Sequence, residues 1–449
     1  MKSQASGQSA SNRKEVEFIT GKIRDEYVNA AGLLSGHFPP DGTHLLNDLN
    51  DYLPFLSWYG HDDFVRQQLS VATEYAIDGL MPVGNRILSW RQDEWLGALW
   101  GQFEADPTSE LASLIELGLK TLDAKLNDRG IIKAFHNLET NASPAVFDPR
   151  TGALLETLLD ISNNFPQAQE IALDCLDKLV EWSQTYQQWL IPNFVFYTSS
   201  AKTKISKFNP FKMPQKVLYP YIDGVRSSLG DMLVGLPFGR QIKLAKQNSN
   251  LVHSFIRAYE RTGRVEYWDF VSRWFGDFTK FMYRDGQCFS GLNNRFKGQV
   301  VKLSHNHPVV EICLEIVRIT GNTSYLAMGE RIVEYWLSKR MTNGLFPAFG
   351  DVTYAFLDDQ TDLVVLFVKL YRVLASQKYL DYANTLYKAI IVNFMCADGL
   401  ARYSYLNGKK FQKRIVTPKY NALFLKASIA LDHADQILED HIWAILRDR

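Results

Sequence analysis

Apolar and polar residues follow one another along this chain in a unit that recurs about every 55 residues. Each copy contains a helix that is apolar on nearly all sides, a short break, a second helix with one apolar stripe, and a polar loop. The apolar helices are predicted to begin near Leu46, Gln92, Gly152, Ser249, Pro308, Thr361 and Tyr420. The amphipathic helices are predicted to begin near Asp62, Ser109, Gln167, Val265, Thr323 and Lys378.

Glycine marks the boundaries of the unit. The break between paired helices is clearest at Thr262-Gly263-Arg264 and Thr320-Gly321-Asn322, where glycine can adopt the left-handed conformation that ends a helix. A second glycine ends the amphipathic helix, as in Asp285-Gly286-Gln287 and Asn343-Gly344-Leu345. Helical hairpins of this kind stack because no single copy can bury its own apolar face.

The pattern therefore predicts an all-α fold, an (α/α)6 toroid of inner and outer helices with short strands or loops at one rim. Seven hairpins remain the alternative count, because a helix around 13–33 adds another outer member. We expect one domain over residues 12–449, which follows a disordered tail at residues 1–11. The spacing between inner helices is enlarged once, which predicts an insertion at about 190–248.

Composition narrows the class of protein. The formal net charge is zero, which argues against a nucleic-acid partner. The sequence contains no uninterrupted run of about 20 apolar residues, so no membrane span is predicted. The four cysteines are scattered without a CxxC pair, so we expect reduced thiols. The first residues contain no apolar signal core, and the expected location is the cytoplasm, with secretion left open.

The predicted insertion is rich in cations and aromatic residues. Only Asp223 and Asp231 oppose its basic side chains, and Tyr219 and Tyr221 are among its aromatic residues. The basic residues are Lys202, Lys204, Lys207, Lys212, Lys216, Arg226, Arg240, Lys243 and Lys246. Long connections in compact folds are often functional, so a lid over an anionic or sugar ligand is one interpretation. A solvated insertion that only docks on the ring is the other.

Polar residues that could carry chemistry gather where inner helices begin. In a closed ring these starts share one rim, and their dipoles point into it. Asp93 and Glu94 lie in the first turn of one inner helix, and Asp358, Asp359 and Asp362 lie at the start of another. Carboxylates on opposite sides of a pocket are what glycoside hydrolysis requires. Acidic residues also favour any first helical turn, so simple capping is the alternative.

Aromatic and basic residues flank these carboxylates and are candidates for substrate binding. Trp90, Trp95 and Tyr354 would stack on sugar rings, whose C–H faces are apolar. Arg86 and His136 would orient a hydroxyl or pair with a carboxylate.

His305 and His307 lie in the segment Ser304-His305-Asn306-His307-Pro308, where Pro308 is predicted to be the first helical residue. The histidines would then lie just outside the helix and would not converge on one ion, so neither a metal nor a cofactor is predicted. A general acid/base role suits them because imidazole titrates near neutrality. A hydrogen-bonded rim histidine without chemistry is the alternative.

The whole chain resembles the six-hairpin (α/α) toroids of carbohydrate-active enzymes: glycosidases, unsaturated glucuronyl hydrolases, polysaccharide lyases and the N-acylglucosamine 2-epimerase group. Residues 304–311 are similar to the His-x-x-His-x-x-Glu helix start of the epimerase group, with Glu311 four residues after His307. The following Thr320-Gly321-Asn322 break is shared across these enzymes. The resemblance implies a sugar or a sugar polymer as substrate.

Our first functional hypothesis is a glycoside hydrolase that acts on an oligo- or polysaccharide, including uronic-acid polymers. One carboxylate would come from Asp93 or Glu94 and the other from Asp358, Asp359 or Asp362. The second hypothesis is a sugar epimerase or polysaccharide lyase, with His305 or His307 and Tyr354 transferring protons. The third is a non-catalytic toroid that binds a glycan or a protein. The apolar outer stripes leave a homo-oligomer open.

Overall fold

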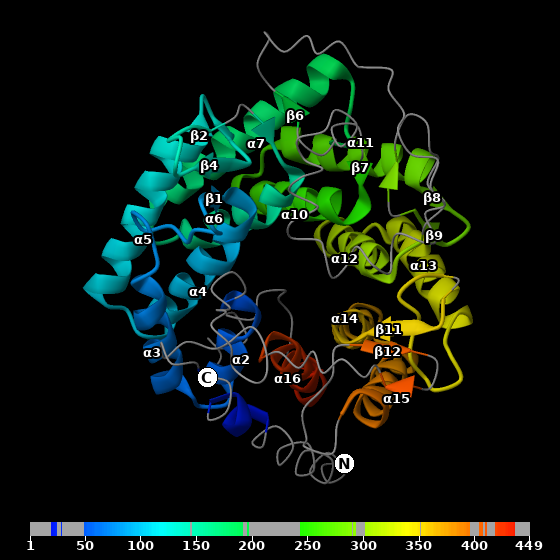
Figure 1. The fold of residues 1–449 in the computed structure, drawn as a ribbon. Coiled ribbons are helices and arrows are strands. Elements are labelled where there is room, and N and C mark those ends of the chain that lie inside the picture. The colour runs from blue at the N-terminus through cyan, green and yellow to red at the C-terminus, as the bar shows by residue number, and fades with distance from the viewer. Residues whose placement is uncertain are drawn as a thin grey trace.

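The computed structural model describes residues 19–24, 28, 49–143, 146–191, 195–196, 243–289, 291–292, 301–350, 352–395, 404–406, 409–410 and 418–435. Helices of the described residues form two concentric rings (Figure 1). The inner ring consists of α2 (Leu53–Trp58), α4 (Gln92–Ala105), α6 (Gly152–Ile161), α10 (Ala245–Thr262), α12 (Leu303–Thr320), α14 (Leu357–Leu374) and α16 (Pro418–Asp432). The outer ring consists of α3 (Asp62–Thr73), α5 (Ser109–Thr121), α7 (Pro166–Tyr186), α11 (Val265–Met282), α13 (Leu326–Ser338) and α15 (Gln377–Phe394).

The inner helices pack against one another in chain order. Helix α4 contacts α6, α6 contacts α10, and the series continues through α12 and α14 to α16. The short helix α2 touches both α16 and α4, so it closes the ring between the two ends of the chain (Figure 1). Residues 19–24 are also helical, and Ile19 and Ile23 are fully buried. The rest of the predicted first helix, and most of the predicted insertion, lie outside the described residues.

The predicted starts of the helices agree with the structure at α4, α6, α3, α5 and α11, and within one residue at α7 and α15. The region predicted from Thr323 begins with a short 3-10 helix, η6 (Thr323–Tyr325), and continues as α13. Helix α2 begins at Leu53, later than the predicted Leu46. Four inner helices, α10, α12, α14 and α16, begin earlier than predicted, because their first turns are polar and the apolar pattern misses them. The clearest case is α12, which begins at Leu303.

The prediction that Pro308 begins its helix was therefore wrong, and both histidines lie within α12 rather than before it. Pro308 is the sixth residue of α12, so its missing N–H removes a helical hydrogen bond close to the start of the helix. The first residue is secured from outside instead, since Leu303 N–H donates to the carbonyl of Ala348 at 3.0 Å.

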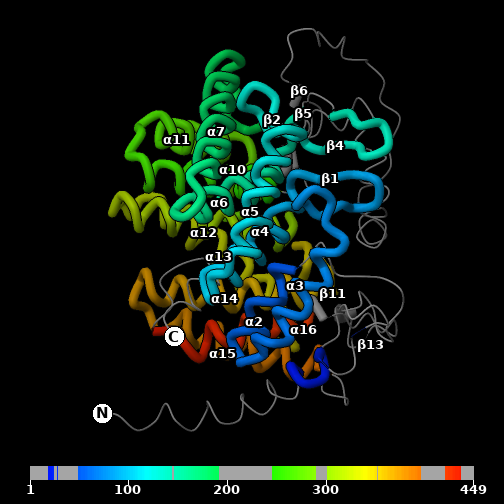
Figure 2. Tube along the Cα trace, turned by 90° about the vertical axis from the view of Figure 1, so that its left-hand side faces the viewer, coloured from blue at the N-terminus to red at the C-terminus, as the bar shows by residue number. Residues whose placement is uncertain are grey.

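Short antiparallel strands lie together along one side of the helices, where β1, β4, β5 and β11 are seen in Figure 2. They are β1 (Arg86–Leu88), β2 (Asn127–Asp128), β3 (Ile131–Ile132), β4 (Phe135–Asn137), β5 (Val146–Phe147), β6 (Val195–Phe196), β7 (Lys243–Leu244), β8 (Tyr283–Arg284), β9 (Gln287–Cys288), β10 (Gly291–Leu292), β11 (Tyr354–Phe356), β12 (Ser404–Leu406) and β13 (Lys409–Lys410). Strand β1 pairs with β4, so two distant rim loops are joined, and β11 pairs with β12. These strands lead into the inner helices, which confirms the predicted rim.

The glycine positions follow from backbone geometry. Gly263 and Gly321 both have φ of +67° at the ends of inner helices, as their sequence context predicts. Gly152 serves another purpose, because a Cβ atom there would lie 2.5 Å from the Cα atom of Leu251. Helices α6 and α10 thus approach each other backbone to backbone. In the described part of the chain, none of the helices is long and apolar enough to cross a membrane.

Candidate functional site

The first group of predicted site residues lies in the first turn of α4. Asp93 is half-buried, and its Oδ1 atom has no hydrogen-bond partner among the described residues. Burial raises the pKa of Asp93 to about 7, and the charge of Arg91 only partly opposes the effect. Glu94 follows it in the same turn and is also half-buried. A carboxyl group that is half protonated at neutral pH is suited to act as a proton donor.

The two tryptophans beside these carboxylates have different surroundings. Trp95 is fully buried, and its indole N–H donates to the carbonyl of Gly79 at 3.0 Å. It has no surface to offer a sugar ring in this structure and serves as a core residue. Trp90 is half-buried, and the guanidinium carbon of Arg150 lies 3.6 Å from the centre of its ring. One face of Trp90 is therefore already covered by a cation.

Arg86 and His136 lie on the paired strands β1 and β4. The guanidinium of Arg86 lies over Phe135, with 4.8 Å between its carbon and the ring centre. His136 is 4% exposed, and its Nδ1 lies 2.9 Å from the Ser143 hydroxyl, which donates to the carbonyl of Lys125. The Nδ1–H of His136 is therefore the donor to Ser143, and the pKa of the imidazole is lowered by burial and by Lys125. This arrangement orders the rim loop rather than presenting the imidazole to a ligand.

The second group is a charge cluster at the starts of α12 and α14, which we name the His307 cluster: His307, Asp358, Asp359, Asp362 and Lys426. The Nε2 atom of His307 lies 3.5 Å from one oxygen of Asp362. The other oxygen of Asp362 lies 3.6 Å from the Nζ of Lys426, on α16. The cluster thus joins three inner helices.

His307 is 7% exposed, and neither ring nitrogen has a hydrogen-bond partner among the described residues. Burial lowers the pKa of His307, although the charges of Asp362 and Glu311 oppose the effect. The imidazole is therefore neutral at pH 7 and keeps a lone pair that can accept a proton. Neighbouring His305 is 6% exposed in the turn before it.

The pKa is raised at two aspartates of the cluster and lowered at the third. Burial raises the pKa of Asp358, and the charge of Asp362 adds to the effect. Burial and the charge of Asp358 raise the pKa of Asp359 well above its ordinary value, and its Oδ2 has no hydrogen-bond partner among the described residues. Burial also acts against the ionised form of Asp362, but Lys426, His307 and Lys246 outweigh it and lower its pKa. The cluster therefore combines two carboxyl groups with a raised pKa, one carboxyl group with a lowered pKa and an imidazole with a lowered pKa.

Tyr354 is the first residue of β11, just before α14. Its ring makes edge contacts with Phe349 and Phe356, at centroid distances of 5.9 Å and 5.4 Å. The other predicted tyrosines, Tyr219 and Tyr221, lie outside the described residues.

Lys426 is a residue that the sequence analysis missed. A signal for it was present, because Lys426 is the only charged residue between Tyr420 and Leu431 in a helix that is otherwise apolar. A single charge in a buried helix is expected to have a partner. Lys246, in the first turn of α10, was predicted only as part of the insertion. Its charge helps to lower the pKa of Asp362 in the same cluster.

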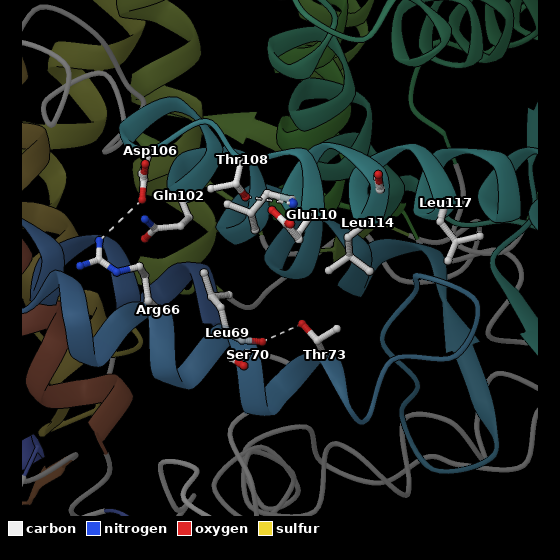
Figure 3. Close-up of a pocket in the computed structure, with 12 residues that line it drawn as sticks. Arg66, Leu69, Ser70, Thr73, Gln102, Asp106, Thr108, Glu110, Leu114 and Leu117 are labelled. Atoms are coloured by element: carbon white, nitrogen blue, oxygen red, sulfur yellow. Dashed lines mark hydrogen bonds and ion pairs between the residues drawn. The ribbon is translucent and has the colours of Figure 1, made fainter.

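A groove of about 550 Å³ lies elsewhere, between the outer helix α3 and helix α5 (Figure 3). Leucines such as Leu69, Leu114 and Leu117 line it, and none of the predicted site residues does. Its polar edge holds Arg66 and Asp106, whose closest charged atoms are 3.9 Å apart. The groove is therefore separate from both groups of titratable residues.

Comparison with known proteins shows likeness in structure only. No protein-family model matches the chain, and no curated protein matches its sequence. Solved structures do match over nearly the whole chain. Cellobiose 2-epimerase from Spirochaeta thermophila has a TM-score of 0.56 at 10% identity, over 97% of this chain and 100% of that chain. D-mannose isomerase has a TM-score of 0.56 at 10% identity, over 96% and 99%.

A third match is the GH76 α-mannanase from Bacteroides thetaiotaomicron, with a TM-score of 0.53 at 11% identity, over 86% of this chain and 97% of that chain. All three are six-hairpin (α/α)6 toroids, and the described residues share their arrangement of an inner and an outer ring of helices, with α2 and α16 both placed in the inner ring. The chain therefore has the (α/α)6 toroid fold, as its sequence pattern predicts.

Proposed function

We propose that this protein is a carbohydrate-converting enzyme that removes a proton from a carbon atom of a sugar and returns a proton to the same carbon, as an epimerase does, or to the adjacent carbon, as an isomerase does. One observation carries the proposal: the Nε2 atom of the buried His307 lies 3.5 Å from an oxygen of Asp362, while its Nδ1 has no hydrogen-bond partner among the described residues. Asp362 favours the tautomer with the proton on Nε2. Nδ1 then keeps the lone pair and is the candidate base.

The neighbouring groups supply the rest of the chemistry. Nδ1 of His307 would remove the proton from the carbon next to the sugar carbonyl, and the bonding electrons would move onto the carbonyl oxygen. The carboxyl group of Asp358 or Asp359, which holds its proton more strongly than an ordinary aspartate, would protonate that oxygen as negative charge develops. Return of a proton to the same carbon from the other face gives the epimer, and delivery to the adjacent carbon gives the isomer. No other reactant is consumed.

The comparisons support a sugar as substrate, because structures with this fold over nearly the full chain include a sugar epimerase and a sugar isomerase. The sequence of the α12 start, similar to that of the epimerase group, supports it independently. Lys426 and Lys246 add positive charge near the cluster. These charges would stabilise an enediolate in a site of low dielectric constant.

Incubation of the protein with aldoses and disaccharides in D₂O tests the proposal, because exchange at carbon removes a proton signal from the NMR spectrum of the sugar. We expect uptake of one deuterium next to the carbonyl carbon, slowed at least about 100-fold in His307→Asn. His433→Asn is the control, since His433 packs edge-on against Trp58 at the far end of α16. Absence of deuterium uptake with every sugar of the panel would reject the proposal.

Glycoside hydrolysis is the second candidate, and Asp93 favours it. Its pKa of about 7 suits a general acid, while Asp362 is held ionised on the other side of the ring, where α14 faces α4 (Figure 1). The same incubations distinguish the two reactions. Hydrolysis releases new reducing ends without deuterium at carbon, and it would be abolished by Asp93→Asn but only weakened by His307→Asn.

A further inference from the structure

Four inner helices carry a buried amide side chain near their first turn, and each amide binds both the N–H and the C=O of one residue in the preceding rim loop. We name these pairs the amide clamps. They are Gln92 with Met81 (3.0 and 2.8 Å), Asn248 with Ile191 (2.8 and 3.0 Å), Asn306 with Cys288 (3.1 and 2.9 Å) and Gln360 with Phe346 (2.8 and 2.9 Å). All four amides are fully buried.

The clamps belong to the repeating unit. In three copies the clamped residue stands two positions after the glycine that ends the amphipathic helix: Met81 after Gly79, Cys288 after Gly286 and Phe346 after Gly344. A side-chain amide offers both N–H donors and a carbonyl acceptor, so it pairs with a loop residue as a neighbouring strand would. Each clamp therefore fixes the loop against the start of the next inner helix.

The clamps coincide with the candidate chemistry. Asn306 stands between His305 and His307, and Gln360 stands between Asp359 and Asp362. Helix α6 contains neither asparagine nor glutamine, and it also carries none of the predicted site residues.

One loop links the two clamped helices of the His307 cluster. Gln360, on α14, holds Phe346, and two residues later the carbonyl of Ala348 accepts a hydrogen bond from Leu303, the first residue of α12. Asn306 then ties its own helix start together, since its Nδ2 also donates to the carbonyl of Lys302 at 2.8 Å. The contact between α12 and α14 thus passes through the clamped loop as well as through side chains.

We propose that Asn306 and Gln360 are positioning residues, which set the register of α12 against α14 and thereby hold His307 at Asp362. The proposal rests on the proposed function for its catalytic consequence but not for its structural one. A shift of about 1 Å between reacting groups is enough to slow catalysis by about 100-fold.

The test compares the same substitution in two clamps. Methionine keeps the length of glutamine but makes neither hydrogen bond, so Gln360→Met and Gln92→Met should lower the melting temperature by similar amounts. Only Gln360→Met should move Asp362 relative to His307. Because the charge of Asp362 raises the pKa of His307, its displacement should lower that pKa further, by about half a pH unit or more. NMR titration of labelled histidines measures the pKa of His307 without any substrate.

We also expect Gln360→Met to reduce kcat for deuterium exchange at least about tenfold, with little change in KM. An unchanged His307 titration in folded Gln360→Met would overturn the proposal, whatever happens to turnover. A shifted titration with unchanged turnover would support positioning and reject the proposed catalytic role of the pair. If Gln360→Met does not fold, Gln360→Asn replaces it, since its shorter amide cannot reach both atoms of Phe346. A smaller decrease in the pKa of His307 is then expected, and an unchanged pKa overturns the proposal.

Discussion

Replacement of Asp93 by asparagine should stabilise the protein at neutral and alkaline pH but not in acid. The folded-state pKa of Asp93 is about 7, against an ordinary value of 3.8, because the carboxyl group is buried. The difference of about 3 pH units corresponds to at most about 4 kcal/mol, at about 1.36 kcal/mol per unit. Since the folded-state pKa is raised, this stability is fully present below pH 3.8 and is lost as the pH rises towards 7. Asparagine keeps the shape without the charge, so it escapes that loss.

Thermal unfolding at a series of pH values measures the effect. A chain of 449 residues has an unfolding entropy of about 0.9 kcal/mol/K, so about 4 kcal/mol corresponds to roughly 4 °C in Tm. We expect Asp93→Asn and the unsubstituted protein to melt together near pH 4 and to diverge up to pH 8. Asp63→Asn is the matched control, since Asp63 also lies in a first helical turn but is exposed. A difference in Tm that is constant between pH 4 and pH 8 would refute the reasoning.

Two further predictions concern the ring itself. Lys426→Met should destabilise the protein by roughly 1–3 kcal/mol at pH 7, because Asp362 loses its nearest cation. The pKa of Asp362 is lowered in the folded state, so urea unfolding should show the destabilisation by Lys426→Met above pH 4. The destabilisation should become smaller as the pH falls further. A destabilisation that persists in acid would contradict the pairing of Lys426 with Asp362. Gly152→Ala should cost about 2–4 kcal/mol because its Cβ would meet Leu251, whereas Gly276→Ala, with open space on α11, should stabilise by up to about 1 kcal/mol. Equal effects of the two substitutions would contradict the close approach of α6 and α10.

The ring of helices was predictable because its signal is carried by long segments. The apolar pattern of α4, α6 and α14 and the glycine breaks depend on local preferences that a sequence shows directly. The start of α12 was not predicted, because its first turn is polar and is stabilised by the distant Ala348 carbonyl. Pro308 suggested a later start, and only the tertiary contact corrects that prediction.

The candidate site could be predicted in its location but not in its contacts. Sequence pattern placed Asp358, Asp362 and His307 at or just before the starts of inner helices, and the structure has all three inside α12 and α14, close to those starts. It could not distinguish the half-buried Trp90 from the fully buried Trp95, because both flank the same carboxylates and only packing separates them. Lys426 was missed because its partner lies 64 residues away in the chain.

The opposite titration of Asp358 and Asp362 shows why the cluster, rather than any one residue, has the properties of an acid/base site. The two residues lie one turn apart on α14, and the helix dipole favours the ionised form of both. Burial overrides the dipole at Asp358, whereas at Asp362 nearby positive charge, that of Lys426 above all, outweighs burial and lowers the pKa. The charge of Asp362 in turn makes ionisation of Asp358 more costly. The difference between the two carboxyl groups therefore depends on how α12, α14 and α16 are placed against one another, which is why the amide clamps and the cluster have to be tested together.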